Sequence, residues 1–227
     1  QFGPLKCLAL EALVSIVANV RDTCRSTTSA QLAASTVASE LRDRKDMKKH
    51  LSVAADHFNA KPKTGIEYLR TVMNMAHGDA EDAQLDPDSV ADFFHSTHTC
   101  SKEFMGVYMG GAAQFNQDVL RAFLRRLDFR HLNVDEALRM FIDHMRLPGE
   151  AQQISRVLET FAAHYYAANK AIYASPDMVF VLSFSVILLN TDLHNKTVKR
   201  KMTFDDFVRN NRELERDGLS RQIMRQL

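Results

Sequence analysis

The stretch MVFVLSFSVILLNTDLHN, residues 178–195, constrains the fold more strongly than any other feature of the chain. It is apolar for most of its length and then turns abruptly polar. On a helix it forms two apolar stripes on roughly opposite sides, whereas a soluble surface helix normally needs only one. The first stripe is Leu182, Val186, Leu189 and Leu193; the second is Phe180, Phe184, Ile187 and Leu188, continued by Asp192 and Asn195. Either both stripes face a core, as in the central helix of an all-α domain, or the second one lines an open groove.

Helical periodicity dominates the rest of the chain. No segment alternates with a period of two over the length of a strand, and no hairpin signal is present, so the sequence predicts an all-α fold of about ten helices. Proline at a first helical turn and capping-box pairs mark where helices start. These signals are Pro62, Pro87, Pro176, Asn133 with Glu136, and Thr203 with Asp206.

The N-terminal part has a different character. Apolar residues between positions 5 and 20 follow a single helical stripe, and the Ser-, Thr- and Ala-rich segment after them indicates a linker. We therefore predict an upstream amphipathic helix and linker over residues 1–49, followed by one domain over 50–227.

The bulk composition excludes several classes of protein. With 45% hydrophobic and 25% charged residues, the chain is typical of a globular domain. Its formal net charge of +1 gives no strong overall positive potential that would attract nucleic acid. The basic runs RDRKDMKKH and KTVKRKM are interpreted as solvated helix faces or turns, with a phosphate or lipid contact as the alternative. The longest apolar run is too short for a transmembrane segment, and no signal peptide is present. Three cysteines without a CxxC pair suit a reducing compartment.

Metal and enzyme chemistry find little support. His95, His98 and Cys100 have ligand-like spacing, but no companion pair stands nearby to complete a zinc site. Asp192 and His194 point in different directions on a helix, and no nucleophile motif accompanies them. The glycine pair in YMGGAAQ lacks the Lys and Ser/Thr of a phosphate-binding loop. We expect no metal and no cofactor.

Three motifs together resemble the Sec-seven domain, the exchange-factor module that acts on Arf-family small GTPases. They are FNAKPKTGIEYL (58–69), RLPGEAQQISRVLETFAAHYY (146–166) and FSVILLNTDLHN (184–195), and they occur in the family's order and spacing. The resemblance runs from about residue 50 to the C-terminus, and the large Golgi-type members are the most similar. It implies an elongated right-handed array of about ten helices with a hydrophobic groove, acting on cytoplasmic faces of Golgi or endosomal membranes through the parent protein.

The resemblance also assigns the second stripe of residues 178–195. By carry-over from the family, Phe180, Phe184, Ile187 and Leu188 line the groove that takes the GTPase switch regions, and Asn195 bonds to the captured switch backbone. Exchange requires no covalent chemistry. The expected partner is a GTPase in its nucleotide-free or GDP-bound state. A factor that binds a displaced switch conformation weakens the affinity of the GTPase for nucleotide by linkage.

Two further expectations depend on the family pattern. In the family a glutamate opposes Mg²⁺ and the β-phosphate, and aligning YMGG with Tyr-Leu-Gly-Glu puts Gly111 at its position. Brefeldin A wedges between some members and Arf, and the positions that decide sensitivity correspond to Phe184, Ser185, Asp192 and Met202. Phe184 with Ser185 is a mixture of the resistant and sensitive types, so the sequence predicts partial sensitivity.

Three hypotheses therefore stand. The chain is an active Arf exchange factor, or a GTPase-binding domain of the same fold with weak exchange activity because Gly111 replaces the glutamate, or a helical adaptor without a GTPase partner. The groove stripe and Asn195 argue against the third hypothesis.

Overall fold

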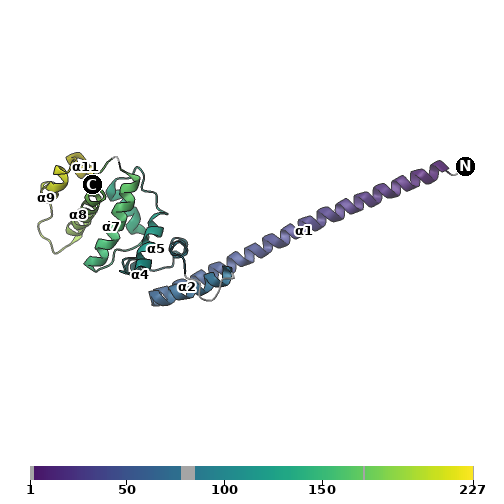
Figure 1. Cartoon of the computed structure of the whole chain (residues 1–227), viewed down its shortest axis with the longest axis horizontal. Helices are drawn as coiled ribbons and strands as arrows, with labels where there is room; N and C mark the ends of the chain where they lie inside the picture. The colour runs from purple at the N-terminus through teal and green to yellow at the C-terminus, as the bar shows by residue number, and fades with distance from the viewer. Residues whose placement is uncertain (1–2, 78–84, 171, 227) are drawn as a thin grey trace. The chain divides into compact units, whose positions relative to one another are not determined.

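The structure is a computed structural model that describes residues 3–77, 85–170 and 172–226; the side chains of 3–12, 23–38, 76–77, 222 and 226 are outside the description. The chain divides into two units, residues 1–50 and 51–227. Eleven helices and no strands occur in the described ranges, which confirms the all-α prediction (Figure 1). The helices are α1 Gly3–Ala60, α2 Pro62–His77, α3 Pro87–Ser96, α4 Lys102–Met109, α5 Gln114–Leu124, α6 Val134–His144, α7 Ala151–Ala168, α8 Pro176–His194, α9 Phe204–Asn210, α10 Arg212–Arg216 and α11 Arg221–Gln226.

The first unit consists of the N-terminal part of α1. The segment expected to be a linker is helical, and α1 is continuous through it. Alanine is the strongest helix former, and the Ser and Thr residues between the alanines are only mildly unfavourable, so the composition that indicated a linker is compatible with a helix. The described members of the expected stripe, Leu13, Ile16, Val17 and Val20, are all exposed.

The second unit is built around one aromatic core. Phe58, at the end of α1, is fully buried, and its ring lies edge-on to those of Phe94 and Tyr108, with centroids 5.1 and 6.0 Å away. A second group of rings, Phe129, Phe141, Phe161 and Tyr165, lies where α6 and α7 meet. Edge-on and offset rings stabilise a core beyond their area of contact, by about 0.5–1.5 kcal/mol a pair.

The helix starts follow the sequence signals. Pro62, Pro87 and Pro176 each open a helix, and both predicted capping boxes are present at α6 and α9. In the first box the Asn133 amide donates to a carboxylate oxygen of Glu136 at 2.8 Å. These caps satisfy amides that have no partner inside the helix.

One described helix, α8, has the length and apolar composition of a membrane span. Its first two turns are inserted in the core, where Met178, Val179, Leu182 and Ser183 are buried and the helix packs along α7. Figure 1 shows α8 beside α7 in the second unit. The apolarity of these two turns is therefore that of a core helix.

Candidate functional site: the groove beside α8

Helix α8 begins at a strong start signal. Ser175 caps it by accepting a hydrogen bond from the Met178 amide at 3.1 Å, and Pro176 occupies its first turn. The core covers only the first half of the helix. Beyond Ser183 every residue of α8 is at least partly exposed, so its apolar C-terminal half lies at the surface.

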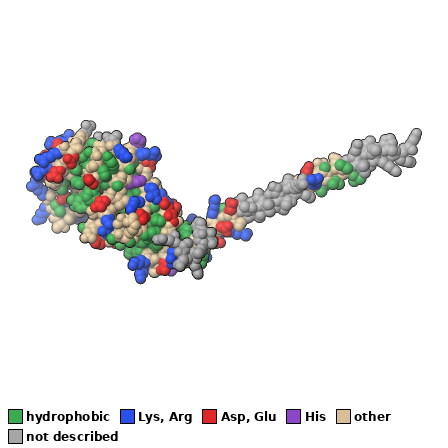
Figure 2. Space-filling view, in the orientation of Figure 1, with side chains coloured by type: hydrophobic (Ala, Val, Ile, Leu, Met, Phe, Trp, Pro, Cys, Tyr) green, Lys and Arg blue, Asp and Glu red, His purple; other side chains and the backbone are tan. Residues whose placement is uncertain are grey.

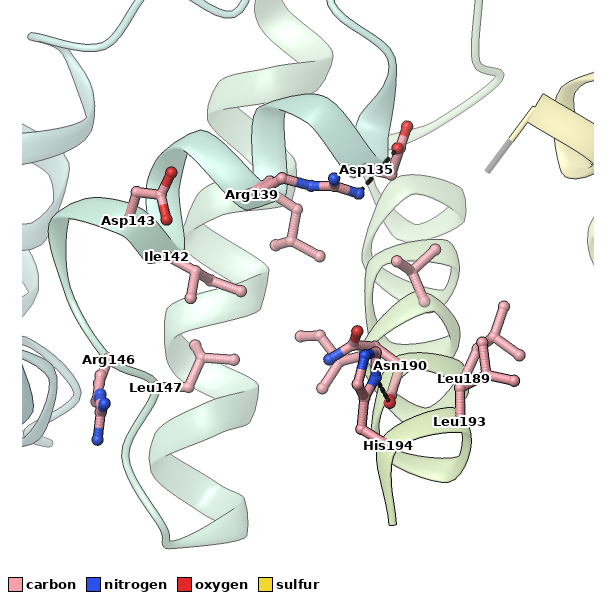
Figure 3. Close-up of a pocket in the computed structure, with 13 residues that line it drawn as sticks. Asp135, Arg139, Ile142, Asp143, Arg146, Leu147, Leu189, Asn190, Leu193 and His194 are labelled. Atoms are coloured by element: carbon pink, nitrogen blue, oxygen red, sulfur yellow. Dashed lines mark hydrogen bonds and ion pairs between the residues drawn. The ribbon is translucent and has the colours of Figure 1, made fainter. Parts of the chain in front are cut away.

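A groove of about 720 Å³ lies between this exposed half of α8 and helix α6 with the loop that follows it. Figure 3 shows Ile142 and Leu147 on one side of the groove, with Asn190 and His194 extending from α8 toward them. The groove is lined by Asp135, Leu138, Arg139, Ile142, Asp143, Arg146, Leu147, Val186, Ile187, Leu189, Asn190, Leu193 and His194. Its apolar lining consists of leucine, isoleucine and valine side chains, and α6 contributes charged groups to the lining.

The residues of α8 that line this groove differ from those predicted to line the GTPase-binding groove. Of the four expected, only Ile187 does so, together with Val186, Leu189 and Leu193, which belong to the stripe first considered as core. That stripe starts in the core at Leu182 and emerges into the groove because the core ends one turn later.

The second stripe forms an exposed apolar strip on the outer side of α8. Phe184 is 38% exposed and Leu188 52%, while Phe180 is half-buried with its ring 6.4 Å from that of Phe184. Large apolar side chains left in solvent at adjoining positions indicate a surface that binds a partner. Groove and strip meet at Ile187, so α8 offers apolar surface on both sides of that residue.

The polar end of α8 is held in a defined conformation. The Met202 amide donates to the Asp192 carboxylate at 2.7 Å, and the Lys201 ammonium donates to the carbonyl oxygens of Asp192 and Asn195. The Asn195 side-chain oxygen accepts from the Thr197 amide at 2.9 Å. The structure thus brings Asp192, Asn195 and Met202 together, and the Asn195 side-chain NH₂ remains exposed as a donor.

Ser185 has a bracing position. Its hydroxyl donates to the side-chain oxygen of Asn211 at 2.6 Å, and the buried Asn211 donates in turn to the Phe207 carbonyl at 2.9 Å. These bonds tie α8 to the end of α9.

Gly111 lies in a different hollow, formed by α2, α4 and α5 and lined by Ile66, Val107 and Phe115 among others. A Cβ added at Gly111 would meet the Tyr108 carbonyl oxygen at 3.0 Å and Asn116 Cγ at 3.1 Å. Asn116 itself donates to that carbonyl at 2.6 Å. A side chain at position 111 would therefore start against its own loop, and this geometry gives no support to Gly111 as the position of a carboxylate that faces the α8 groove.

A carboxylate that the sequence analysis did not single out lies at the end of a loop that lines the groove. Glu150 is the N-cap residue of α7, at the end of the loop whose Arg146 and Leu147 line the groove. It is exposed, and its carboxylate makes no hydrogen bond or ion pair with any residue in the described ranges. The signal was available in LPGEAQ, where an acidic residue follows Pro-Gly directly before a helix.

The loop that carries Glu150 is anchored on α4. The Arg146 amide donates to the Lys102 carbonyl at 3.0 Å, and the Lys102 ammonium donates to the Asp143 carbonyl. A Cβ added at Gly106 would lie 1.7 Å from the Arg146 carbonyl oxygen, so only glycine permits this close approach. The backbone before Glu150 is therefore fixed from one side.

The histidine cluster considered for metal has structural roles. His95 stacks on Phe123 with ring centroids 4.1 Å apart, and its Nε2 lies 3.1 Å from the Phe123 carbonyl oxygen. Burial lowers the pKa of His95 and raises the pKa of the Cys100 thiol to about 12. Within the described residues, no group of three potential metal ligands comes together.

An all-helical unit with an exposed apolar groove at the end of one long helix defines a protein-binding module. A family model of the Sec7 domain matches residues 47–227, and the chain belongs to that family.

Curated relatives carry exchange-factor names. The chain is 45% identical over 174 residues to ARF guanine-nucleotide exchange factor GNOM of Arabidopsis thaliana, covering 77% of this chain and 12% of the relative. It is 38% identical over 178 residues to Brefeldin A-inhibited guanine nucleotide-exchange protein 2 of the same plant, covering 78% of this chain and 9% of the relative. The chain thus spans only about a tenth of the length of these relatives.

Solved structures agree with the fold. The Sec7p catalytic domain is 31% identical with a TM-score of 0.67, covering 78% of this chain and 90% of that one. A Sec7 domain bound to ARF1-GDP and brefeldin A is 34% identical with a TM-score of 0.68, covering 81% of this chain and 90% of that one.

Proposed function

We propose that this chain binds an Arf-family small GTPase and promotes the release of GDP, so that GTP takes its place. The observation that carries the proposal is the exposed apolar end of α8, with its groove, its outer strip and the Asn195 donor at its tip. A similar domain is found on ARF1-GDP, and the curated relatives are named as exchange factors. By the same analogy, the parent protein acts peripherally on Golgi or endosomal membranes.

The mechanism follows from linkage. Nucleotide phosphates and Mg²⁺ order the switch segments of a GTPase. Because the α8 groove binds those segments in a displaced conformation, the factor lowers the affinity for nucleotide, and nucleotide lowers the affinity for the factor by the same ratio. Rebinding of GTP then releases the factor, and no bond in the protein is made or broken.

We further propose that Glu150, and not Gly111, supplies the carboxylate that opposes Mg²⁺ and the β-phosphate. The position of Glu150 supports this proposal. Its carboxylate is exposed, has no partner among the described residues and follows the loop that forms one side of the groove. A carboxylate held about 4 Å from a phosphate oxygen is repelled by roughly 4 kcal/mol at an effective dielectric near 20. Expressed at the transition state, that energy corresponds to about a thousandfold in rate.

The test is the rate of fluorescent GDP dissociation from a panel of Arf proteins. The parent chain should accelerate release, Glu150→Gln should slow it by two to three orders of magnitude, and Gly111→Glu should leave it within about twofold. Glu150→Gln removes the charge at nearly constant volume, and a binding titration with nucleotide-free Arf checks that the groove is intact.

The outcomes separate the three hypotheses. No acceleration by the parent together with strong acceleration by Gly111→Glu would favour the weakly active domain and reject Glu150. A chain that neither binds nor accelerates any Arf protein would be a helical adaptor.

Brefeldin A sensitivity is a second proposal for the same surface. Phe184 on the outer strip and the pair of Asp192 and Met202 lie on the exposed half of α8 and the segment after it, while the Ser185 hydroxyl is already engaged by Asn211. We expect partial inhibition by the drug, increased in Phe184→Tyr because the added hydroxyl supplies a donor.

A further inference from the structure

The basic residues of the chain are unevenly distributed. Residues 196–227 contain nine Lys and Arg against five Asp and Glu, a net formal charge of +4, so the remaining 195 residues carry −3. An overall charge of +1 therefore conceals a cationic C-terminal segment. Figure 2 shows Lys and Arg side chains along the edge of the second unit where Figure 1 places α9.

We define the basic edge by five exposed cations of the loop after α8 and of helices α9 and α11: Lys196, Lys199, Arg200, Arg209 and Arg225. Arg221 of α11 is also exposed but is left out because its guanidinium is paired with Glu215. Lys196 and Lys199 have no hydrogen bond or ion pair with any described residue. The Asp206 carboxylate forms ion pairs with both Arg209 and Arg200. The pair with Arg200 is 4.0 Å long, and the Arg200 side chain is 87% exposed. Lys201 is excluded from the edge because its ammonium is bound to the end of α8.

An aromatic ring lies among these cations. Phe204, the first residue of α9, is 37% exposed, and the Arg225 guanidinium lies over its ring at 5.1 Å from the centroid. An arginine on an aromatic ring is a stable pair that keeps its positive charge toward solvent. Lysines and arginines around a half-exposed aromatic are typical of protein surfaces that rest at a lipid–water interface.

We propose that the basic edge rests on an anionic phospholipid surface. The three hollows described between α6 and α8, among α2, α4 and α5, and at the outer side of α6 are all lined by residues before 195. The cations of the edge thus lie on a surface segment outside those hollows. This arrangement suits the headgroup layer of a phospholipid bilayer better than a single anion bound in a pocket. This inference does not depend on GTPase exchange.

The experiment is sedimentation of the full 227-residue chain with vesicles of phosphatidylcholine alone or mixed with phosphatidylserine. The parent chain should bind the phosphatidylserine vesicles and release them as salt is raised, because the attraction is screened over about 10 Å at 0.1 M salt. The double variant Lys199→Glu, Arg200→Glu should lose at least about thirtyfold in partition coefficient, since two attractive charges are replaced by two repulsive ones.

The matched control is Lys61→Glu, Lys63→Glu, which makes the same change of net charge on exposed residues at the start of α2. Figure 1 shows α2 at the other end of the second unit from α9. This variant should keep binding within about threefold of the parent, as only a diffuse charge effect remains. Any contribution of α1 is common to all three proteins, and thermal melts verify that each is folded.

Equal losses in both double variants would overturn the proposal, because total charge alone would then govern binding. Equal binding to pure phosphatidylcholine would also overturn it. A parallel titration with a single-stranded oligonucleotide addresses the other polyanion, and binding to it without binding to phosphatidylserine vesicles would assign the edge to nucleic acid instead.

Discussion

Phe184 and Leu188 are the residues at which binding and stability separate most clearly. Both are large and apolar, and with Phe184 38% and Leu188 52% exposed, truncation removes less buried surface than at a core position. Phe184→Ala and Leu188→Ala should change the free energy of unfolding by less than about 1 kcal/mol, as for other surface sites, and should weaken Arf binding at least tenfold. Thermal melts beside binding titrations measure the two effects.

Leu182→Ala is the matched control on the same helix. Leu182 is fully buried, and a Leu→Ala change in a core costs about 2–5 kcal/mol. Melting temperatures that fall equally for Leu182→Ala and Leu188→Ala would mean that the outer strip is ordinary core, and the proposed binding surface would have to be abandoned.

The sequence identified the helix that carries the proposed site, but not which of its residues line the hollow beside α6. Periodicity gives the angle of each side chain around α8, and that angle was right for Leu182. It does not give the point along the helix where the core ends, which depends on packing by α7 and decides that Val186, Leu189 and Leu193 face the groove. Glu150 was overlooked for a different reason, because the acidic residue in LPGEAQ was not weighed as a candidate carboxylate.

At the scale of elements, the helix starts were predictable, whereas the helical conformation of the segment expected to be a linker was not. Pro176 and the pair of Asn133 and Glu136 act through contacts within four residues, so the sequence contains the whole interaction. The conformation of the segment after Val20 depends instead on small propensity differences summed over many residues. Composition alone could not distinguish a helix from a linker there.

Gly106 sets how closely α4 approaches the loop between α6 and α7. Because a Cβ there would overlap the Arg146 carbonyl oxygen at 1.7 Å, Gly106→Ala must push the backbone apart. We expect a loss of roughly 1–3 kcal/mol in the free energy of unfolding by urea, as for overpacked sites. We also expect slower GDP release, because the loop carries Glu150.

Gly149 provides the control for that prediction. It lies in the same loop, and a Cβ there would meet no atom within 4 Å. Gly149→Ala should leave the urea midpoint close to that of the parent. If both glycine variants unfold at the parent's midpoint, then the contact between α4 and Arg146 is looser than the structure has it.

At the scale of the whole molecule, the second unit should lose stability in mild acid. Burial lowers the pKa of His95 and of His164 in the folded state, whereas an unfolded histidine titrates near 6.5. Between pH 7.5 and 5.5 the unfolded chain therefore binds more protons than the folded chain. As the pH is lowered through this range, the free energy of unfolding decreases. The urea midpoint of the parent should decrease as the pH is lowered from 7.5 to 5.5, and that of His95→Gln should decrease less. Identical slopes of midpoint against pH for the two proteins would exclude His95 as a cause.

The boundary between the two units yields a prediction about which part of the chain folds alone. The last turns of α1 belong to the core of the second unit, since Ala54, Ala55 and Phe58 are fully buried and Gly65 packs so closely that a Cβ would lie 2.4 Å from Phe58 Cα. A chain of residues 47–227 should therefore melt within a few degrees of the full chain, whereas a chain of 61–227 loses an aromatic anchor whose removal costs about 3–5 kcal/mol.

Circular dichroism melts of the three chains make this measurement, and Phe58→Ala in the full chain isolates the aromatic contribution. Among the first 46 residues, all those whose side chains the structure describes are exposed, including Leu13, Ile16, Val17 and Val20. Their removal should accordingly cost little stability and improve solubility, because an apolar stripe without a partner promotes association. A 47–227 chain that melts far below the full chain would show instead that the N-terminal part of α1 stabilises the Sec7 domain directly.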